Sequence, residues 1–489
     1  MKSFSHLKSN QYSIKSREIR DYIYSMVKSD ADSMQADYYT KNYYGSKNAF
    51  LWIDRLGVDE RADTLLTYLK TVKNIGFSDD KFCVNRISDD LIRFRSLNFD
   101  DGNHNINMVL ASLEYHLTKA YLRYVVGQRY GFTNPYGMFN HLDIKNKDSL
   151  QVSYYKLFEV AMDRPNKKFW VNAINEVRHH NLSNYLTAIE PNNELYREFS
   201  KRLPSAVTRN QRVKLLCNME RARWRLKDEP QRHDKYVLVN VPSQHLMAKD
   251  GKKILSMRIS IGSFDTKTPL MISQIKRMDI NPQWIIPKSI IVKSISKHAQ
   301  DETYFDSHRY FIRHRISGKR VDVKQVTRSM LESGDYFVIQ EGGEGNALGR
   351  IVFRFNNDLA IYLHDTSSRA NFEQSNRDVS HGCVRLEKPF DFAVFLLSDQ
   401  DKKLSNKIQY SMTADVQSKS VFEKSSEPTV SKDTLNREKL ISSVNVQPAV
   451  PLFILYYTIY PDENNVMKEY GDVYGYDRVI YQYLQNYMK

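Results

Sequence analysis

The stretch Ser380-His381-Gly382-Cys383-Val384-Arg385-Leu386 places one of only three cysteines between a histidine–glycine pair and an arginine. Just upstream, the alternating pattern of Leu359 to His364 (LAIYLH) predicts a β-strand in which Tyr362 and His364 share one face. An imidazole on that face can meet, across a loop, the thiol of Cys383, which lies 19 positions later (383 − 364). A nearby imidazole lowers the pKa of a thiol and activates it, so this spacing predicts a catalytic cysteine–histidine pair.

The order of the residues restricts the base to a histidine upstream of the cysteine. No histidine follows Cys383 up to Lys489, which excludes a papain-like arrangement with its histidine far downstream. His364 and His381 are the near candidates. Gly382 allows a tight turn in which the N–H groups of Gly382 and Cys383 point at one oxygen and form an oxyanion hole. The alternative is a buried structural thiol, because free cysteine is among the most buried residue types.

Several pieces of sequence accompany this motif. The run YLHDT…SHGCVRL resembles the active-site signature of the L,D-transpeptidases of the YkuD family, and its context resembles the YcbB-like branch with a helical scaffold. The segments ASLEYHLTKAYLRYV and NMERARWRL resemble, more loosely, the scaffold of that branch. The pieces matching the catalytic half occur in the family's order and cover most of residues 233–489: Val237-Leu-Val-Asn-Val-Pro242, Lys267-Thr-Pro269, Asn281-Pro-Gln-Trp284, Asn346-Ala-Leu-Gly-Arg350 and Ala449 to Tyr457.

The resemblance implies an α+β protein with a mostly helical N-terminal scaffold and a mixed, predominantly β catalytic domain. Local patterns agree, because Ile106 to Val126 has apolar residues at helical spacing and the period changes to two at Tyr236. Asp250-Gly251 predicts a hairpin turn between two of the strands. We expect an N-terminal helical or extended segment (1–48), the scaffold (49–232) and the catalytic domain (233–489), the last with a capping subdomain (288–335) and a low-complexity insertion (414–444).

Composition narrows the class of partner and the compartment. A net charge of +15 suits either a basic surface in water or attraction to an anionic polymer. No phosphate-binding loop, zinc-finger spacing or Arg-rich tract is present, so no nucleic acid is expected. No apolar run reaches the ~18 residues of a membrane span, and the N-terminus lacks the apolar core of a signal peptide. The resemblance implies a periplasmic or cell-envelope protein whose export signal was trimmed. Cys83 and Cys217 are expected to be unpaired.

The resemblance implies a peptidoglycan L,D-transpeptidase. Cys383 would attack the third residue of a tetrapeptide stem, release D-Ala and form a thioester, which an amine of a second stem resolves into a 3→3 cross-link. His364 would be the base. The support of the oxyanion site is assigned to Gly382, His381 and Ser380, and substrate binding to Tyr362, Arg385, Trp284 and Asn346. No metal or organic cofactor is expected, and carbapenems are expected to acylate the cysteine.

Three other functions stay open at this point. An L,D-carboxypeptidase or a lipoprotein-anchoring enzyme would have the same motif, because only the acceptor of the acyl group differs. A non-catalytic envelope scaffold is the alternative of another class, in which the cysteine site is vestigial. Arg385 can pair with a substrate carboxylate or brace its loop, and the sequence slightly favours the brace. The group that orients His364 is open as well, since Asp365, its neighbour in a strand, points to the opposite face.

Overall fold

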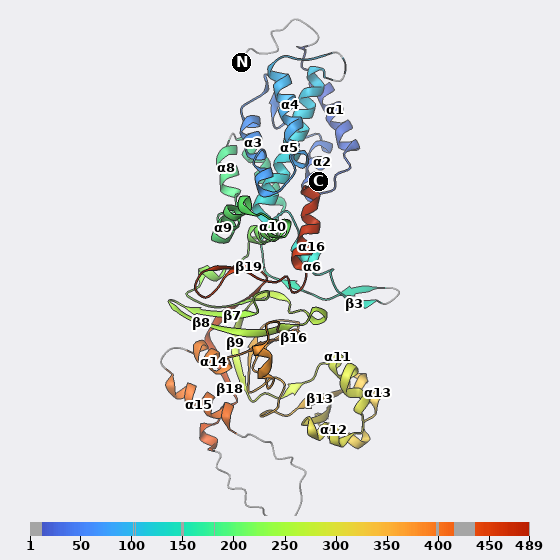
Figure 1. The fold of residues 1–489 in the computed structure, drawn as a ribbon. Coiled ribbons are helices and arrows are strands. Elements are labelled where there is room, and N and C mark those ends of the chain that lie inside the picture. The colour runs from blue at the N-terminus through green and yellow to red at the C-terminus, as the bar shows by residue number, and fades with distance from the viewer. Residues whose placement is uncertain are drawn as a thin grey trace, which may run out of the picture.

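The computed structural model describes residues 12–100, 102, 104–147, 151–179, 181–397, 401–414 and 436–488. Figure 1 shows an elongated molecule with helices at one end, a large sheet in the middle and a small separate unit beside the sheet. The predicted α+β class is confirmed, because a helical N-terminal region precedes a β-rich half. Among the described residues, no helix combines the length and the apolar character that crossing a membrane requires.

The helical region is built around α5 (Ile106–Tyr130), most of whose residues are buried. Asn105 caps its first turn by accepting a hydrogen bond from the Met108 N–H at 3.0 Å. The helix predicted for this stretch is confirmed and extends four residues beyond Val126. Helices that pack against it are α1 (Ser16–Ser29), α2 (Gln35–Gly45), α3 (Arg61–Leu69), α4 (Val84–Arg95), α8 (Leu182–Ile189) and α10 (Arg209–Arg223). The other helices of the region are α6 (Pro135–Phe139), α7 (Lys167–Arg178) and α9 (Glu194–Arg202).

The central sheet has ten strands and closes on itself, because β14 pairs with both β15 and β9. The predicted hairpin is confirmed, with Asp250 paired to Lys253 across Gly251, whose φ is +56°. The strands follow the order β14-β15-β17-β8-β7-β6-β18-β9-β5, and β16 pairs with β8. Their bounds are β5 (Phe158–Glu159), β6 (Lys235–Asn240), β7 (His245–Asp250), β8 (Lys253–Gly262), β9 (Leu270–Ile280), β14 (Ile351–Phe355), β15 (Leu363–His364), β16 (Asp378–Ser380), β17 (Val384–Leu386) and β18 (Ser443–Leu455).

Two expectations about these strands are wrong in their bounds. The strand predicted for residues 359–364 is shortened to β15, because Asn357 Oδ1 accepts hydrogen bonds from the N–H groups of Leu359 and Ile361 and holds a turn there. Strand β18 begins at Ser443, inside the stretch expected to be a low-complexity insertion. Residues 415–435 of that stretch lie outside the described residues. Helices α14 (Pro389–Leu396) and α15 (Lys402–Thr413) lie between β17 and that stretch.

A small unit between Trp284 and Gln340, called here the lid, has a hydrophobic core of its own. Ile291, Phe305, Ile312 and Val338 are among its buried residues. Two of its strands, β11 and β12, lie within residues 288–335, the stretch that was expected to form a capping subdomain. The lid consists of β10 (Trp284–Ile285), α11 (Lys288–Ile290), the π-helix η8 (Ile291–Ile295), α12 (Glu302–Ser307), β11 (Tyr310–His314), β12 (Arg320–Val321), α13 (Arg328–Ser333) and β13 (Tyr336–Gln340). Its strands pair in the order β10-β13-β11-β12.

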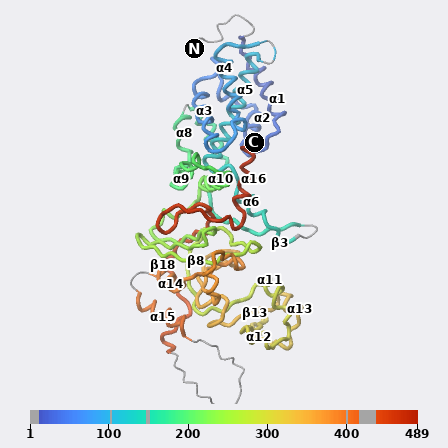
Figure 2. The backbone as a smooth tube through the Cα atoms, in the orientation of Figure 1, coloured from blue at the N-terminus to red at the C-terminus, as the bar shows by residue number. Residues whose placement is uncertain are grey.

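The C-terminal helix α16 (Tyr476–Leu484) returns from the sheet to the helical region, as the tube in Figure 2 shows. It packs against α10. Asp477 Oδ1 accepts a hydrogen bond from Arg221 Nη1 at 2.5 Å, and Asp477 Oδ2 accepts one from the Thr458 hydroxyl at 2.6 Å. Arg221 and Asp477 are only 3% and 6% exposed. A buried ion pair therefore joins the scaffold to the end of the chain. Three two-stranded pairs complete the fold: β1 (Ile53–Asp54) with β2 (Gly57–Val58), β3 (Ile144–Lys147) with β4 (Val152–Tyr154), and β19 (Ile459–Pro461) with β20 (Met467–Glu469).

The substitution Asp477→Asn is expected to lower the free energy of unfolding by about 3–5 kcal/mol, because it leaves the Arg221 charge buried without a counterion. Chemical denaturation followed by circular dichroism measures this loss. The matched control is Glu469→Gln, which removes the exposed partner of Lys214 on the same helix α10. An exposed pair contributes at most about 1 kcal/mol. Equal losses for the two variants would contradict the structural role of the buried pair.

Candidate active site

Cys383 lies in a sharp turn between β16 and β17, both of which pair with β8. Gly382 has φ +107°, a left-handed conformation that favours glycine. A Cβ at this position would lie 3.1 Å from Ile361 Cδ1 and 3.6 Å from the Lys267 carbonyl oxygen. The turn therefore needs glycine before the cysteine, both for its backbone angle and for the tight space beside Ile361.

Hydrogen bonds inside the turn assign Ser380 a bracing position. Its hydroxyl donates to the Cys383 carbonyl at 2.6 Å and accepts from the Gly382 N–H at 3.1 Å. The expectation that both Gly382 and Cys383 offer free N–H groups to an oxyanion is therefore wrong for Gly382. Within the described part of the chain, the Cys383 N–H has no hydrogen-bond acceptor. One backbone donor next to the sulfur is left for a reacting oxygen.

Two residues that sequence reasoning did not assign support this turn from behind. The Thr268 hydroxyl donates to the Gly382 carbonyl at 2.9 Å and accepts from the Gly262 N–H at 2.9 Å. Tyr474 donates to the Gly262 carbonyl at 2.6 Å and accepts from the Thr268 N–H at 3.1 Å. Thr268 lies in a quoted family piece, whereas no sequence signal near Tyr474 indicated this role. The chain separation hides it, since Tyr474 and Gly262 are 212 positions apart.

The pairing of β15 with β17 brings the predicted base and nucleophile to one face of the sheet. The strands run parallel with His364 opposite Arg385, and the Val384 N–H donates to the Tyr362 carbonyl at 3.0 Å. This register sets Cys383 beside Tyr362. Residues opposite each other in paired strands share a face, and side chains two positions apart on one strand do as well. Tyr362, His364, Cys383 and Arg385 therefore all point to the same side.

His364 is buried, with 4% of its surface exposed. Its Nδ1 is hydrogen-bonded to the backbone carbonyl of Asp365, which answers the open question of what orients the ring. A proton on Nδ1 leaves the lone pair on Nε2 as the basic site. Burial, followed by the positive charge of Arg385, lowers the pKa of His364 to about 4. The imidazole is therefore neutral at pH 7 and able to accept a proton.

The thiol of Cys383 is protonated in this resting state. Burial raises its pKa above the ordinary value, and the Tyr362 N–H and the Arg385 charge only partly oppose this effect. The sulfur lies 3.9 Å from the Ala360 carbonyl, and among the described residues no hydrogen bond joins it to His364. The expectation that the imidazole holds the thiol pKa low is thus wrong here. Burial disfavours both charges of a thiolate–imidazolium pair, so the pair is neutral.

The remaining predicted residues divide into those that border the cysteine and those that do not. Tyr362 is partly buried, with the Arg354 guanidinium 4.9 Å from the centre of its ring. His381 is exposed on the turn. Burial lowers the pKa of His381 first, followed by the charges of Lys293 on the lid and of Arg385. This electrostatic influence of Lys293 indicates that the lid helix η8 lies near the turn.

The geometry bears differently on two residues that were assigned to substrate binding. Asn346 is 1% exposed, and its side chain is bonded to the carbonyls of Pro282 and Glu341 and to the Leu348 N–H, so it braces a loop. Trp284 pairs with Gln340 in the lid sheet and packs against the lid core. Asn346 is therefore corrected to a bracing residue, whereas substrate binding by Trp284 stays a prediction, because its side chain is only partly buried.

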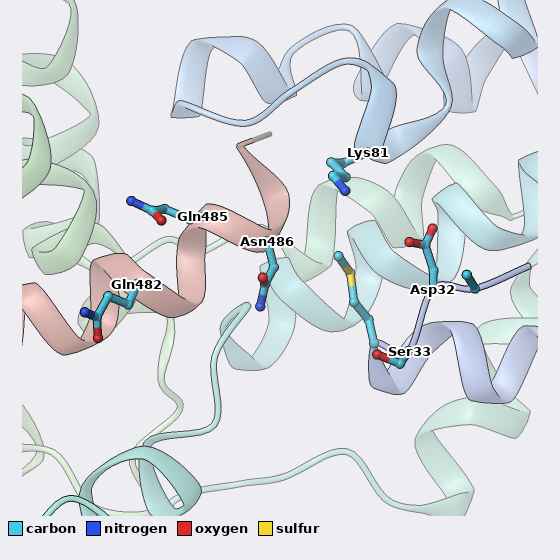
Figure 3. A pocket seen from close by; sticks show the side chains of 8 residues that line it. Asp32, Ser33, Lys81, Gln482, Gln485 and Asn486 are labelled. Carbon is cyan, nitrogen blue, oxygen red and sulfur yellow. The ribbon is translucent and has the colours of Figure 1, made fainter.

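The described residues contain no cluster of three or more histidine, cysteine, aspartate or glutamate side chains that could hold a metal ion. All three cysteines are free. A hollow of about 410 Å³ lies away from the cysteine, where the connection between α1 and α2 meets α16. Figure 3 shows the polar side chains around it, among them Asp32, Lys81 and Asn486. The Asp32 carboxylate is already bound by Lys119 and Arg123, both at 2.7 Å.

Comparison with known proteins agrees with this architecture. The model of the L,D-transpeptidase catalytic domain (YkuD) matches residues 234–403, and the model of the Scaffold domain matches residues 37–203. A Haemophilus influenzae protein, provisionally named an L,D-transpeptidase, is 27% identical over 313 residues, which cover 64% of this chain and 58% of that protein. The chain thus spans less than two thirds of the length of this relative. The chain combines a YkuD catalytic domain with a Scaffold domain, which is the YcbB-like architecture.

A solved structure described as the Ldtfm–avibactam carbamoyl enzyme is also similar over part of the chain. The match is 13% identical and covers 35% of this chain and 48% of that chain, with a TM-score of 0.20. A likeness of this size carries no argument about the fold or the chemistry.

Proposed function

We propose that this protein is a peptidoglycan L,D-transpeptidase of the cell envelope that forms 3→3 cross-links through a Cys383 thioester. The observation that supports the proposal is the parallel pairing of β15 with β17, which places the strand of the neutral His364 next to the turn that contains Cys383. A neutral imidazole can take the proton of a protonated thiol as the sulfur attacks. The match to the YkuD domain suggests the class of substrate.

In the proposed acylation, His364 Nε2 accepts the thiol proton while the sulfur attacks the carbonyl carbon of the third residue of a tetrapeptide stem. The Cys383 N–H donates to the oxyanion that forms. When the intermediate collapses, the bond to the terminal D-Ala breaks and His364 gives its proton to the leaving amine. The products are free D-Ala and a thioester on Cys383.

In the proposed transfer, the side-chain amine of a second stem attacks the thioester. His364 Nε2 takes a proton from the attacking amine and returns it to the leaving sulfur, which regenerates the neutral pair. General acid–base catalysis of this kind contributes typically about 10²–10⁴-fold to the rate. The mechanism uses only side chains and backbone groups of the site. Carbapenems are expected to acylate the same sulfur, because their ring carbonyl offers an equivalent electrophile.

Incubation of the protein with purified disaccharide-tetrapeptides tests the proposal. We expect cross-linked dimers that have lost one D-Ala, together with free D-Ala, identified by mass spectrometry. Disaccharide-tripeptide without any dimer would overturn the transfer step and indicate a carboxypeptidase. A lipoprotein-anchoring enzyme would form dimers only when a lipoprotein peptide replaced the second stem. If the protein forms neither a product nor a carbapenem adduct, it is a non-catalytic envelope scaffold.

A further inference from the structure

Arg258 of β8 and Arg385 of β17 differ in how their charge is balanced within the described residues. Arg258 on β8 is hydrogen-bonded to Glu387 at 2.5–2.9 Å and to Glu373 at 3.1 Å. Arg385 on β17 has no carboxylate within 4.0 Å among the described residues. Residues two positions apart on a strand share a face, so Arg258 and Ser260 lie on the same face of β8.

The residue opposite Arg385 explains why its charge is not neutralised. Arg385 is paired across the strands with Ser260, which is 0% exposed and whose hydroxyl has no hydrogen-bond partner among the described residues. Arg385 Nε is also enclosed and has no partner in the same part of the chain. Of the three guanidinium nitrogens of Arg385, Nε is the one that is both buried and without a partner within the described residues. The two Nη groups also have no hydrogen-bond partner there, so they are accessible. A planar guanidinium with free donors and no counterion is a strong binder of carboxylates.

The position of Arg385 relative to the nucleophile suits one carboxylate of the substrate. It follows Cys383 by two residues on the same face, a spacing of roughly 6–7 Å along a strand. A tetrapeptide donor ends in a carboxylate on the residue immediately after the scissile carbonyl, so its negative charge lies only a few bonds from the atom that the sulfur attacks. Lys293 on the lid adds positive charge to the same neighbourhood, as its effect on His381 indicates.

We propose that Arg385, which Ser260 leaves without a counterion, binds the terminal carboxylate of the donor stem. The guanidinium thereby selects donors whose chain ends one residue beyond the scissile bond. This role rests on the proposed function and names the group on the donor that the site recognises. It also reverses the preference for a bracing Arg385 that the sequence alone suggested, because the side chain has no acceptor to brace against.

The first test compares two donors that differ only in their last group, a tetrapeptide stem ending in D-alanine and the same stem ending in D-alaninamide. Charge-assisted hydrogen bonds predict that the wild type prefers the carboxylate donor by roughly 10- to 100-fold in kcat/KM. In Arg385→Gln the preference for the carboxylate donor over the amide donor falls by that factor, and an effect of the variant on the pKa of His364 or Cys383 cancels in this ratio. Arg258→Gln is the matched control and keeps the preference. An Arg385→Gln variant that still discriminates between the donors would overturn the proposal.

The second test does not depend on transpeptidation. Iodoacetate and iodoacetamide alkylate the same Cys383 thiolate, but only iodoacetate carries a carboxylate. We expect Arg385→Gln to lower the ratio of the two alkylation rates by about 10-fold, and any change in the thiol pKa cancels in this ratio. Ser260→Asp, which supplies an internal counterion, should lower the ratio in the same way, whereas the uncharged Ser260→Asn should not.

The two tests separate failure of the carboxylate site from failure of the proposed function. A ratio that falls in Arg385→Gln and Ser260→Asp supports the carboxylate site even when no cross-linked dimer forms. A ratio that is unchanged in both variants, with circular dichroism showing that they are folded, overturns the site even when the wild type forms dimers.

Discussion

Replacing Cys383 with alanine is expected to abolish both cross-linking and the mass shift that a carbapenem produces, a loss of about 10⁴-fold or more. The chemistry passes through a bond to sulfur, and no neighbouring group can replace it. The other two thiols are poor substitutes, because Cys83 lies at the start of α4 and Cys217 within α10, both in the helical region. Intact-protein mass spectrometry before and after addition of the carbapenem measures the adduct directly.

The matched control for this experiment is Cys83→Ala, which removes a partly buried thiol of the helical region. This variant should be labelled at the wild-type rate. An adduct of unchanged mass in Cys383→Ala, mapped by peptide analysis to Cys83 or Cys217, would disprove the assignment of the nucleophile. Circular dichroism distinguishes a true loss of reactivity from loss of the fold.

Replacing His364 with glutamine is expected to slow acylation by about 10³-fold at pH 7 and to change the shape of its pH profile. In the wild type the imidazole pKa of about 4 predicts a rate that is constant above about pH 5 and falls below it, as protonated His364 can no longer accept the thiol proton. In the variant only preformed thiolate reacts. Because burial raises the thiol pKa above its ordinary value of 9.0, the rate should climb about tenfold per pH unit up to at least pH 9.

A stopped-flow series of carbapenem acylation between pH 4 and pH 10 measures both profiles. His245→Ala is the control, since this histidine lies on β7 and is hydrogen-bonded to the Ser243 carbonyl outside the site. It should leave the wild-type profile intact. A wild-type profile with its acidic limb near pH 6.5, or a His364→Gln profile that stays flat, would contradict the neutral thiol–imidazole pair.

The contrast between Arg258 and Arg385 illustrates what local sequence cannot show. Both arginines lie within β-strands, and the sequence slightly favoured a bracing role for Arg385. The cross-strand register pairs Arg385 with Ser260 and leaves it without a counterion, whereas Arg258 meets Glu387 and Glu373. The protonation states of Cys383 and His364 also depend on tertiary structure. The motif predicted that the thiol and the imidazole act as a pair, but their protonation depends on burial, which no motif reports.

Asn346 and Tyr474 show two ways in which motifs fail to predict the role of a residue. Asn346 belongs to a recognisable piece of sequence and was assigned to the substrate, yet its amide is consumed by the backbone of its own loop. Tyr474 belongs to no motif, yet its hydroxyl supports the strand behind the cysteine. Side chains that form such contacts are chosen by distance in space, and the sequence records only distance along the chain.

Local patterns of side chains were enough to determine the class of fold, the long helix α5 and the β7–β8 hairpin, and they predicted the pairing of the cysteine with its upstream histidine. These features depend on periodicity, turn residues and short spacings, which neighbouring residues specify by themselves. Tertiary structure alone decided where strand β15 begins, which carbonyl orients His364, how Thr268 and Tyr474 support the turn, and that Arg385 has no counterion. Each of these depends on strand register or on exclusion of water, and both arise only when distant segments pack together.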